Sequence, residues 1–179
     1  MMTSFAENIK NILEAIVETD PKKILDIGSA FGKYSIMARE AILSVRAERG
    51  DLTPVDDLEI GCVEMAKYFH ELPWHEKLYQ FHYHTDARNI EWKDMPKFDL
   101  VLLIDVVEHW SKEDSKKLIE DIKNNTGAKV LISTPKDVYF YKEEYYGKDC
   151  PKHVSQWSRE DFEGFILDKS TDQSHIFVV

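Results

Sequence analysis

Short apolar runs alternate with helix-like segments along this chain of 179 residues, and this order restricts the fold more than any other feature. A strand that is apolar along its whole length is buried on both faces, which is typical of a parallel sheet whose crossovers are helices. The runs are KKILDIG (22–28), LEIGCVE (58–64), FDLVLLIDVV (98–107) and AKVLIST (128–134); QFHYHTD (80–86) alternates and predicts a further strand, and SHIFVV (174–179) a last one.

Helical periodicity fills the intervals. Apolar residues at helical spacing predict a first helix over 4–19, with Ser4 as its cap and Pro21 ending it, and a second over 33–48. Three more are expected: one over 66–76 that Pro73 shortens or kinks, one from Ser111 to about residue 124, and one beginning near Ser158. The pattern predicts a single α/β domain over 1–179, a three-layer sandwich with a mostly parallel six- or seven-stranded sheet and an antiparallel last strand.

The charge balance narrows the function classes. The chain has 23 lysines and arginines against 33 aspartates and glutamates, a net charge of −10, which disfavours a binder of nucleic acid and suits a cationic ligand. Neither a signal peptide nor a run of eighteen apolar residues occurs, and the two cysteines are too few for a disulfide framework. We therefore expect a cytoplasmic protein with no membrane partner.

Acidic residues and glycines recur where the predicted strands end. Parallel sheets bind ligands at the carboxyl ends of their strands, so these residues are the candidate site: Asp26, Gly28, Glu64, Asp86 and Asp105. DIGSAFG places Gly28 and Gly32 in a turn before a helix, where the backbone can take positive φ and its N–H groups can receive an anion. The spacing matches neither a dinucleotide fingerprint nor a P-loop, and a tight turn with no ligand is the alternative.

Six segments follow one another between about Lys22 and Phe165: ILDIGSAFGKY, LEIGCVEM, HTDARNI, FDLVLLIDVVEH, VLISTP and HVSQWSREDF. In this order they resemble a class I S-adenosylmethionine-dependent methyltransferase, which has a Rossmann-like fold. The resemblance implies S-adenosylmethionine as the cofactor and the following contacts. The loop would bind the methionine part of the cofactor, and Asp26 would bind its ammonium group. Glu64 would bind the ribose hydroxyls, and Met65 would cover one face of the adenine. Asp86 would accept from the adenine amino group, with the small Ala87 leaving room for the ring, and Asp105 would line the methyl end. The loop comprises Gly28, Ser29, Ala30, Phe31 and Gly32.

Two features depart from the family pattern. Ala30 replaces the loop's middle glycine, and 36 residues separate Gly28 from Glu64, against about 20 in the usual nucleotide-binding unit. An insertion over 45–57 accounts for the second departure. Glu59 is the rival acid, although it would lie within its strand rather than at its end.

Methyl transfer needs alignment of two substrates and, for a hydroxyl or amine acceptor, a base. His109, four residues after Asp105, is the first candidate, and His153 is the second; a hydrogen-bonded structural role is the alternative for both. Segment 136–156 is predicted to be a substrate lid or loop, with Tyr139, Phe140, Tyr141, Tyr145 and Tyr146 as an aromatic wall. Trp157 and Phe162 are expected to be core residues.

Histidines at 70, 75, 82 and 84 raise the question of a metal. His82 and His84 share one face of a strand, but no cysteine or carboxylate pattern completes a site, so no metal is expected.

The sequence therefore predicts transfer of a methyl group to oxygen or nitrogen of a small-molecule acceptor. Two alternatives stay open: a degenerate module that binds the cofactor, or nothing, within an assembly, and a nicotinamide-dependent oxidoreductase, which the absent fingerprint disfavours. Neither the acceptor nor the oligomeric state follows from the sequence.

Overall fold

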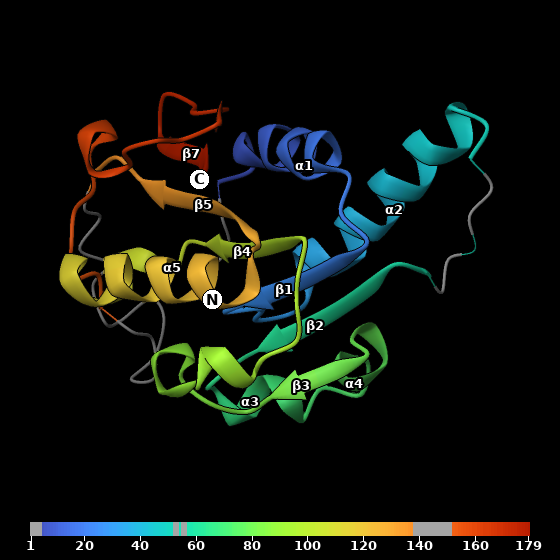
Figure 1. Cartoon of the computed structure of the whole chain (residues 1–179), viewed down its shortest axis with the longest axis horizontal. Coiled ribbons are helices and arrows are strands. Elements are labelled where there is room, and N and C mark those ends of the chain that lie inside the picture. The colour runs from blue at the N-terminus through green and yellow to red at the C-terminus, as the bar shows by residue number, and fades with distance from the viewer. Residues whose placement is uncertain (1–4, 52–53, 55–56, 138–151) are drawn as a thin grey trace.

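The computed structural model describes residues 5–51, 54, 57–137 and 152–179. Its centre is a seven-stranded sheet in the order β3-β2-β1-β4-β5-β7-β6, as Figure 1 shows. The strands are β1 (Lys23–Ile27), β2 (Glu59–Val63), β3 (Phe81–Tyr83), β4 (Leu100–Ile104), β5 (Lys129–Pro135), β6 (Leu167–Asp168) and β7 (Ser174–Val178). β1 to β5 are mutually parallel and β7 runs antiparallel to both β5 and β6, which confirms the predicted fold class.

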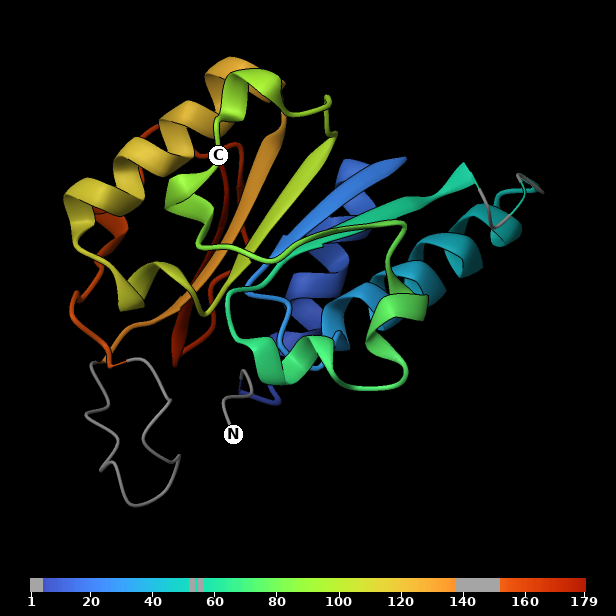
Figure 2. The same cartoon turned by 90° about the horizontal axis from the view of Figure 1, so that it is seen from below.

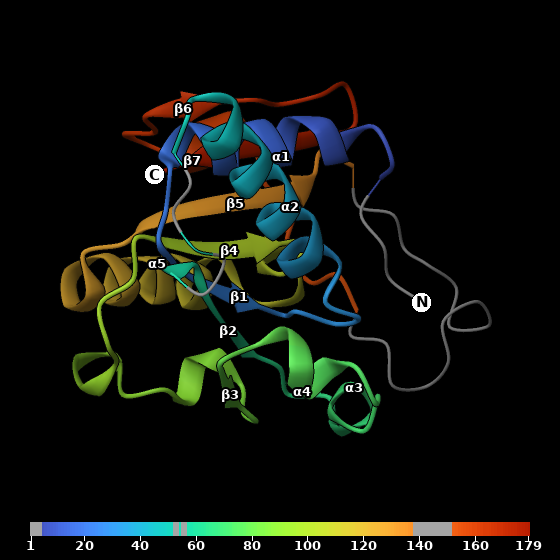
Figure 3. The same ribbon diagram turned by 90° about the vertical axis from the view of Figure 1, so that its right-hand side faces the viewer.

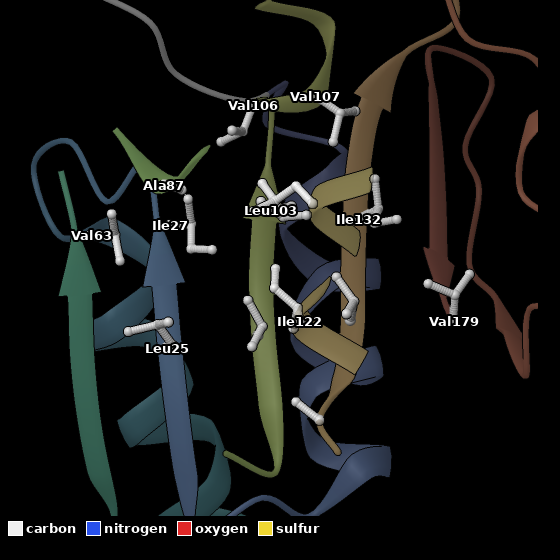
Figure 4. Close-up of a cluster of buried hydrophobic side chains, with 14 of the residues drawn as sticks. Leu25, Ile27, Val63, Ala87, Leu103, Val106, Val107, Ile122, Ile132 and Val179 are labelled. Carbon is white, nitrogen blue, oxygen red and sulfur yellow. The ribbon is translucent and has the colours of Figure 1, made fainter. Parts of the chain in front are cut away.

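Helices cover both faces of the sheet (Figures 2 and 3). On one face lie α1 (Asn8–Thr19) and α2 (Lys33–Glu48), whose residues Ile12 and Ala38 pack with Ile24 and Leu102 of the strands. On the other lies α5 (Lys112–Thr126), whose Ile122 packs among the alternate strand residues (Figure 4). Because successive side chains in a strand point to opposite faces, one apolar strand supplies both cores.

Local signals fix most helix ends. α2 has its predicted bounds, and α5 begins after Ser111, whose Oγ accepts from the backbone N–H of Asp114 at 3.1 Å, and ends at Gly127, φ 75°. α1 ends at Asp20, before Pro21, but begins only at Asn8; the expected cap Ser4 lies outside the described residues.

Two expected helices differ in extent from the structure. The segment around Pro73 forms two single turns, α3 (Lys67–His70) and α4 (His75–Leu78), rather than one kinked helix. The helix expected from Ser158 is only the 3₁₀ turn Arg159–Asp161, because Ser158 and Asp161 close a capping box and Gly164, φ 70°, redirects the chain into β6. β6 itself was not predicted.

Trp157 and Phe162 are buried and stacked at 5.0 Å between ring centroids, as expected of core residues. Within the described ranges, no helix is both long enough and apolar enough to span a bilayer. Residues 138–151 of the predicted lid, with all five of its aromatic residues, lie outside the described part of the chain.

Candidate functional site

The predicted site residues gather at one edge of the sheet. Figure 4 shows β1, β2, β4 and β5 running in one direction, with Val106 and Val107 beyond the carboxyl end of β4. The loop after β1, Glu64 after β2 and Asp105 after β4 therefore meet at this edge, and Asp86 follows β3 on the neighbouring side. We call this the carboxyl edge.

The loop from Gly28 to Gly32 is built from left-handed residues. Gly28 (φ 71°), Ala30 (φ 45°) and Gly32 (φ 79°) all have positive φ. Gly28 is also closely packed, since a Cβ there would lie 2.7 Å from Cγ2 of Val106. Ala30 takes the same backbone region as the two glycines, at a steric cost that a glycine would not have.

Glu64 fastens this loop to the end of β2. Its Oε2 accepts from the backbone N–H of Ala30 at 3.0 Å, and its Oε1 accepts from that of Ala66 at 2.8 Å. Glu64 is 6% exposed, and each carboxylate oxygen retains a further lone pair for a hydroxyl donor. Its rival Glu59 begins β2, at the opposite end of the strand, where it pairs with Lys23 at 2.7 Å.

Asp26 is a buried carboxyl beneath the loop. It is 3% exposed and accepts from the hydroxyl of Tyr79 at 3.2 Å. Burial raises the pKa of Asp26 to about 7. The hydrogen bond from Tyr79 acts in the opposite direction and lowers this pKa, and repulsion from Glu64 raises it further. A cation placed beside Asp26 would favour the ionised form.

Aromatic and apolar groups flank Glu64. Phe31 of the loop contacts Phe69 of α3 edge to face, with 5.0 Å between centroids, and Tyr68 lies 5.1 Å from Phe69. Met65 and Tyr68 are exposed, at 66% and 59%. An exposed Met beside a buried carboxylate suits the flat ring of a nucleoside.

Asp86 has a partner that the sequence argument missed. Its carboxylate caps the 3₁₀ turn Ala87–Asn89 and binds Arg88, with Oδ2 2.6 Å from the guanidinium. The contacts with Arg88 lower the pKa of Asp86. The side chain of Ala87 is buried in the core cluster beside Val63, so the carboxylate of Asp86 is engaged by Arg88 and Ala87 packs inward.

Asp105 and Glu108 form a second acidic pair after β4. Asp105 has φ 54° and accepts from Ser133 Oγ at 3.2 Å. Glu108 is 2% exposed and its Oε2 accepts from Thr134 Oγ1 at 3.2 Å. Burial, and next the charge of Asp105, raises the pKa of Glu108 well above its ordinary value. Glu108 was not among the predicted site residues.

The two predicted bases lie together beside this pair. The rings of His109 and His153 are 4.9 Å apart, and Nδ1 of His109 donates to the backbone carbonyl of Lys152 at 3.2 Å. This donation leaves Nε2 of His109 as the unprotonated nitrogen, a buried atom with no hydrogen-bond partner among the described residues. Burial lowers the pKa of His109, and burial with the neighbouring His109 lowers that of His153 to about 4.

Three groups of side chains among the described residues have the composition of a metal site. Ligand atoms of Glu108, His109 and His153 lie within 4.8 Å of one another. Cys62, His75 and His82 form another such group, as do His70, His82 and His84. The cysteine that the sequence argument found lacking is thus supplied by β2, twenty positions before His82.

Other partners were also invisible in the sequence. Tyr79, Arg88 and His75 each contact a predicted residue, respectively Asp26, Asp86 and Ser29, whose Oγ lies 3.3 Å from Nε2 of His75. The contacts of Tyr79 and His75 follow from the path of the chain after β2, and no spacing motif marks them. Arg88 is local, two positions after Asp86.

Several solved structures have the same fold as this chain. No protein-family model and no curated protein matches the sequence. Magnesium protoporphyrin IX methyltransferase from Synechocystis PCC 6803, with bound SAH, aligns with a TM-score of 0.63 at 15% identity over 96% of this chain and 80% of its own. Human N-acetylserotonin methyltransferase, in complex with SAM, aligns with a TM-score of 0.60 at 14% identity. The alignment covers 96% of this chain and 51% of that one, so this chain spans about half of its length.

The methyltransferase domain of bacterial CtHen1 gives a TM-score of 0.57 at 16% identity over 97% of this chain and 98% of its own. These likenesses extend over nearly the whole chain and agree with the sheet order and the antiparallel β7. The chain therefore has the fold of the class I S-adenosylmethionine-dependent methyltransferases.

Proposed function

We propose that the protein transfers a methyl group from S-adenosylmethionine to an oxygen or nitrogen of a small-molecule acceptor. The observation that carries the proposal is the pairing of carboxyl groups at the carboxyl edge. Asp26 repels Glu64, Asp105 repels Glu108, and none of Asp26, Glu64 and Glu108 has an ion pair among the described residues. A ligand with a sulfonium and an ammonium group compensates such a site.

Each residue has a role that its position supports. Glu64 accepts from the ribose hydroxyls, Met65 covers the adenine, and Asp26 binds the ammonium. Asp105 follows β4, four residues before His109, and would line the methyl end. Asp86 accepts from the adenine amino group and stays bound to Arg88. It does so through the carboxylate lone pairs that Arg88 does not occupy.

When bound, S-adenosylmethionine supplies a methyl group on a sulfonium leaving group. His109 accepts the acceptor's proton at Nε2, because Nδ1 is committed to the carbonyl of Lys152. Its lowered pKa keeps the ring neutral at pH 7, as this role needs. His153, 4.9 Å away, is the second candidate for the same proton.

A binding comparison tests the cofactor. S-Adenosylmethionine and S-adenosylhomocysteine are expected to raise the melting temperature and to bind in calorimetry, whereas NAD does neither. Binding of NAD alone would favour the oxidoreductase alternative. Binding of S-adenosylmethionine without turnover on a panel of phenols, hydroxy acids and primary amines would favour the non-catalytic module, and the absence of binding would overturn the proposal.

Glu64→Gln tests the ribose contact. The variant keeps the size of the side chain but turns one acceptor into a donor that faces a backbone N–H, of Ala30 or of Ala66. We expect the affinity for S-adenosylmethionine to fall by about 1.5–3 kcal/mol, measured by calorimetry. The matched control is Glu59→Gln, on the same strand, with unchanged affinity; the reverse result would move the ribose role to Glu59.

His109→Gln tests the base. Once an acceptor from the panel is turned over, we expect kcat to fall about 10²–10⁴-fold, with unchanged affinity for S-adenosylmethionine. His175→Gln, in β7, is the matched control with wild-type turnover. If His109→Gln turns over like wild type and His153→Gln does not, the proton goes to His153.

A further inference from the structure

Four histidines and one cysteine gather at the β3 side of the sheet, a cluster that the proposed reaction does not use. Cys62 of β2 and His82 of β3 are paired residues of parallel neighbours, so their side chains leave the same face of the sheet. α3 ends at His70 and α4 begins at His75, and His84 follows β3. We call these five residues the histidine cluster.

The inner part of the cluster has tetrahedral dimensions. Sγ of Cys62 lies 3.5 Å from Nδ1 of His82. In a tetrahedral zinc site, Zn–S of about 2.3 Å and Zn–N of about 2.0–2.1 Å place sulfur and nitrogen about 3.6 Å apart. His75 is the third member: its ring centroid is 5.9 Å from that of His82, and one ligand atom from each of the three residues lies within 4.8 Å of the others.

The surroundings keep the nitrogen lone pairs available. Cys62 and His75 are fully buried, and His82 is half-buried. Nδ1 of His75 is buried and has no hydrogen-bond partner among the described residues. His70 donates through Nε2 to the carbonyl of Glu64 at 2.7 Å, which leaves its buried Nδ1 as an acceptor with no partner among the described residues.

We propose that Cys62, His75 and His82 bind a zinc ion, with His70 and His84 at the mouth of the site. One thiolate and two imidazoles form a donor set for a borderline-soft divalent ion and not for magnesium or calcium. Entry is from the side of His84, the one exposed member of the cluster, whose ring stacks on that of His70 at 3.5 Å. The fourth ligand is water or His70.

Such an ion would hold together segments that have little regular structure of their own. The chain between β2 and β3 contains only the single turns α3 and α4, interrupted around Pro73. Two cluster residues reach the carboxyl edge: His75 lies 3.3 Å from Ser29 Oγ of the glycine loop, and His70 binds the backbone of Glu64. The role of the ion is therefore structural, and its binding does not depend on the proposed methyl transfer.

The test uses the full chain, stripped with a chelator and titrated with ZnSO₄ and with CoCl₂. We expect one Zn²⁺ per chain, a rise in melting temperature, and a Co²⁺ spectrum with tetrahedral d–d bands and a thiolate charge-transfer band. Cys62→Ser should abolish the thiolate band. His82→Gln should weaken Zn²⁺ binding more than 100-fold, because loss of a residue that only supports a ligand typically weakens binding about 10–100-fold. His175→Gln, outside the cluster, should bind as wild type does.

Proton release gives a second measurement, which does not depend on how well the variants fold. Coordination by the thiolate releases the Cys62 proton at neutral pH, so calorimetry of the wild type in two buffers of different ionisation enthalpy should show it. Absence of Zn²⁺ binding, or a Co²⁺ spectrum without the thiolate band, would overturn the proposal. Loss of binding in His84→Gln but not in Cys62→Ser would overturn it too, in favour of a site of His70, His82 and His84.

Discussion

Replacement of Asp26 by asparagine is expected to stabilise the ligand-free, metal-free protein at pH 8 and, at the same time, to weaken its binding of S-adenosylmethionine. Asp26 has a pKa of about 7 in the fold, against an ordinary value of 3.8. At 1.36 kcal/mol for each pH unit, this difference corresponds to up to about 4 kcal/mol. Asparagine still accepts from Tyr79 and carries no charge to bury.

The pH dependence distinguishes this cause from a general gain in packing. The folded chain holds the Asp26 proton up to pH about 7, whereas the unfolded chain releases it near pH 4, so stability falls as the pH rises between these values. The stability difference between Asp26→Asn and wild type should therefore grow from pH 4 to pH 8 and then level off. Denaturant unfolding at several pH values, with chelator present, measures it.

Binding should respond in the opposite direction. A cationic ligand needs the ionised carboxyl, so wild-type affinity for S-adenosylmethionine should rise between pH 6 and pH 8, and Asp26→Asn should lose about 1.5–3 kcal/mol of binding at pH 8 together with this dependence. Asp172→Asn, at an exposed position, should change neither property. If Asp26→Asn binds as tightly as wild type, Asp26 does not hold the ammonium.

Such an exchange of stability for binding is expected where a charge is buried for function. It explains why the free protein places acidic groups at the carboxyl edge that repel each other, Asp26 with Glu64 and Asp105 with Glu108. In a fold stabilised by apolar burial, a cation bound beside Asp26 and Glu64 would compensate the repulsion between their carboxyls.

Features that depend on neighbours in the sequence could be predicted. The bounds of α2 follow from its periodicity, and the position of Glu64 follows from the end of an apolar run, since parallel strands bring their ends to one edge. The helix expected from Ser158 was wrong because its starting signal is real but Gly164 and the pairing of β6 with β7 limit it to one turn. A capping box marks a beginning and carries no information on length.

Contacts between residues that are far apart in the sequence could not be predicted. Tyr79 reaches Asp26 over 53 positions, and Cys62 reaches His82 only because β2 and β3 are parallel neighbours in one register. Cys62 and His82 are 20 positions apart, so no short spacing motif predicts that their side chains meet. Spacing motifs identify metal sites within one loop, whereas sites assembled across strands need the register.

Replacement of Gly28 by alanine is the second large effect expected. The substitution combines two costs. The first is conformational: a φ of 71° is left-handed, and a residue with a Cβ adopts it at a cost of about 1–2 kcal/mol. The second is steric, because the new Cβ would lie 2.7 Å from Cγ2 of Val106. Val106 is buried and β-branched, so it cannot rotate away, and overpacking adds about 1–3 kcal/mol. We expect a loss of about 2–5 kcal/mol in the free energy of unfolding and at least a tenfold loss of affinity for S-adenosylmethionine.

A matched glycine separates the two costs. Gly127, at the end of α5, has φ 75° but no atom within 4 Å of its ideal Cβ, so Gly127→Ala should show the conformational cost alone and leave ligand affinity unchanged. Val106→Ala combined with Gly28→Ala removes the clash, and the double variant should be less destabilised than the sum of the two single changes. Additive losses would mean that the loop moves away from Val106 freely. In that case the tight turn after β1 would not be the rigid cradle that binding of the cofactor requires.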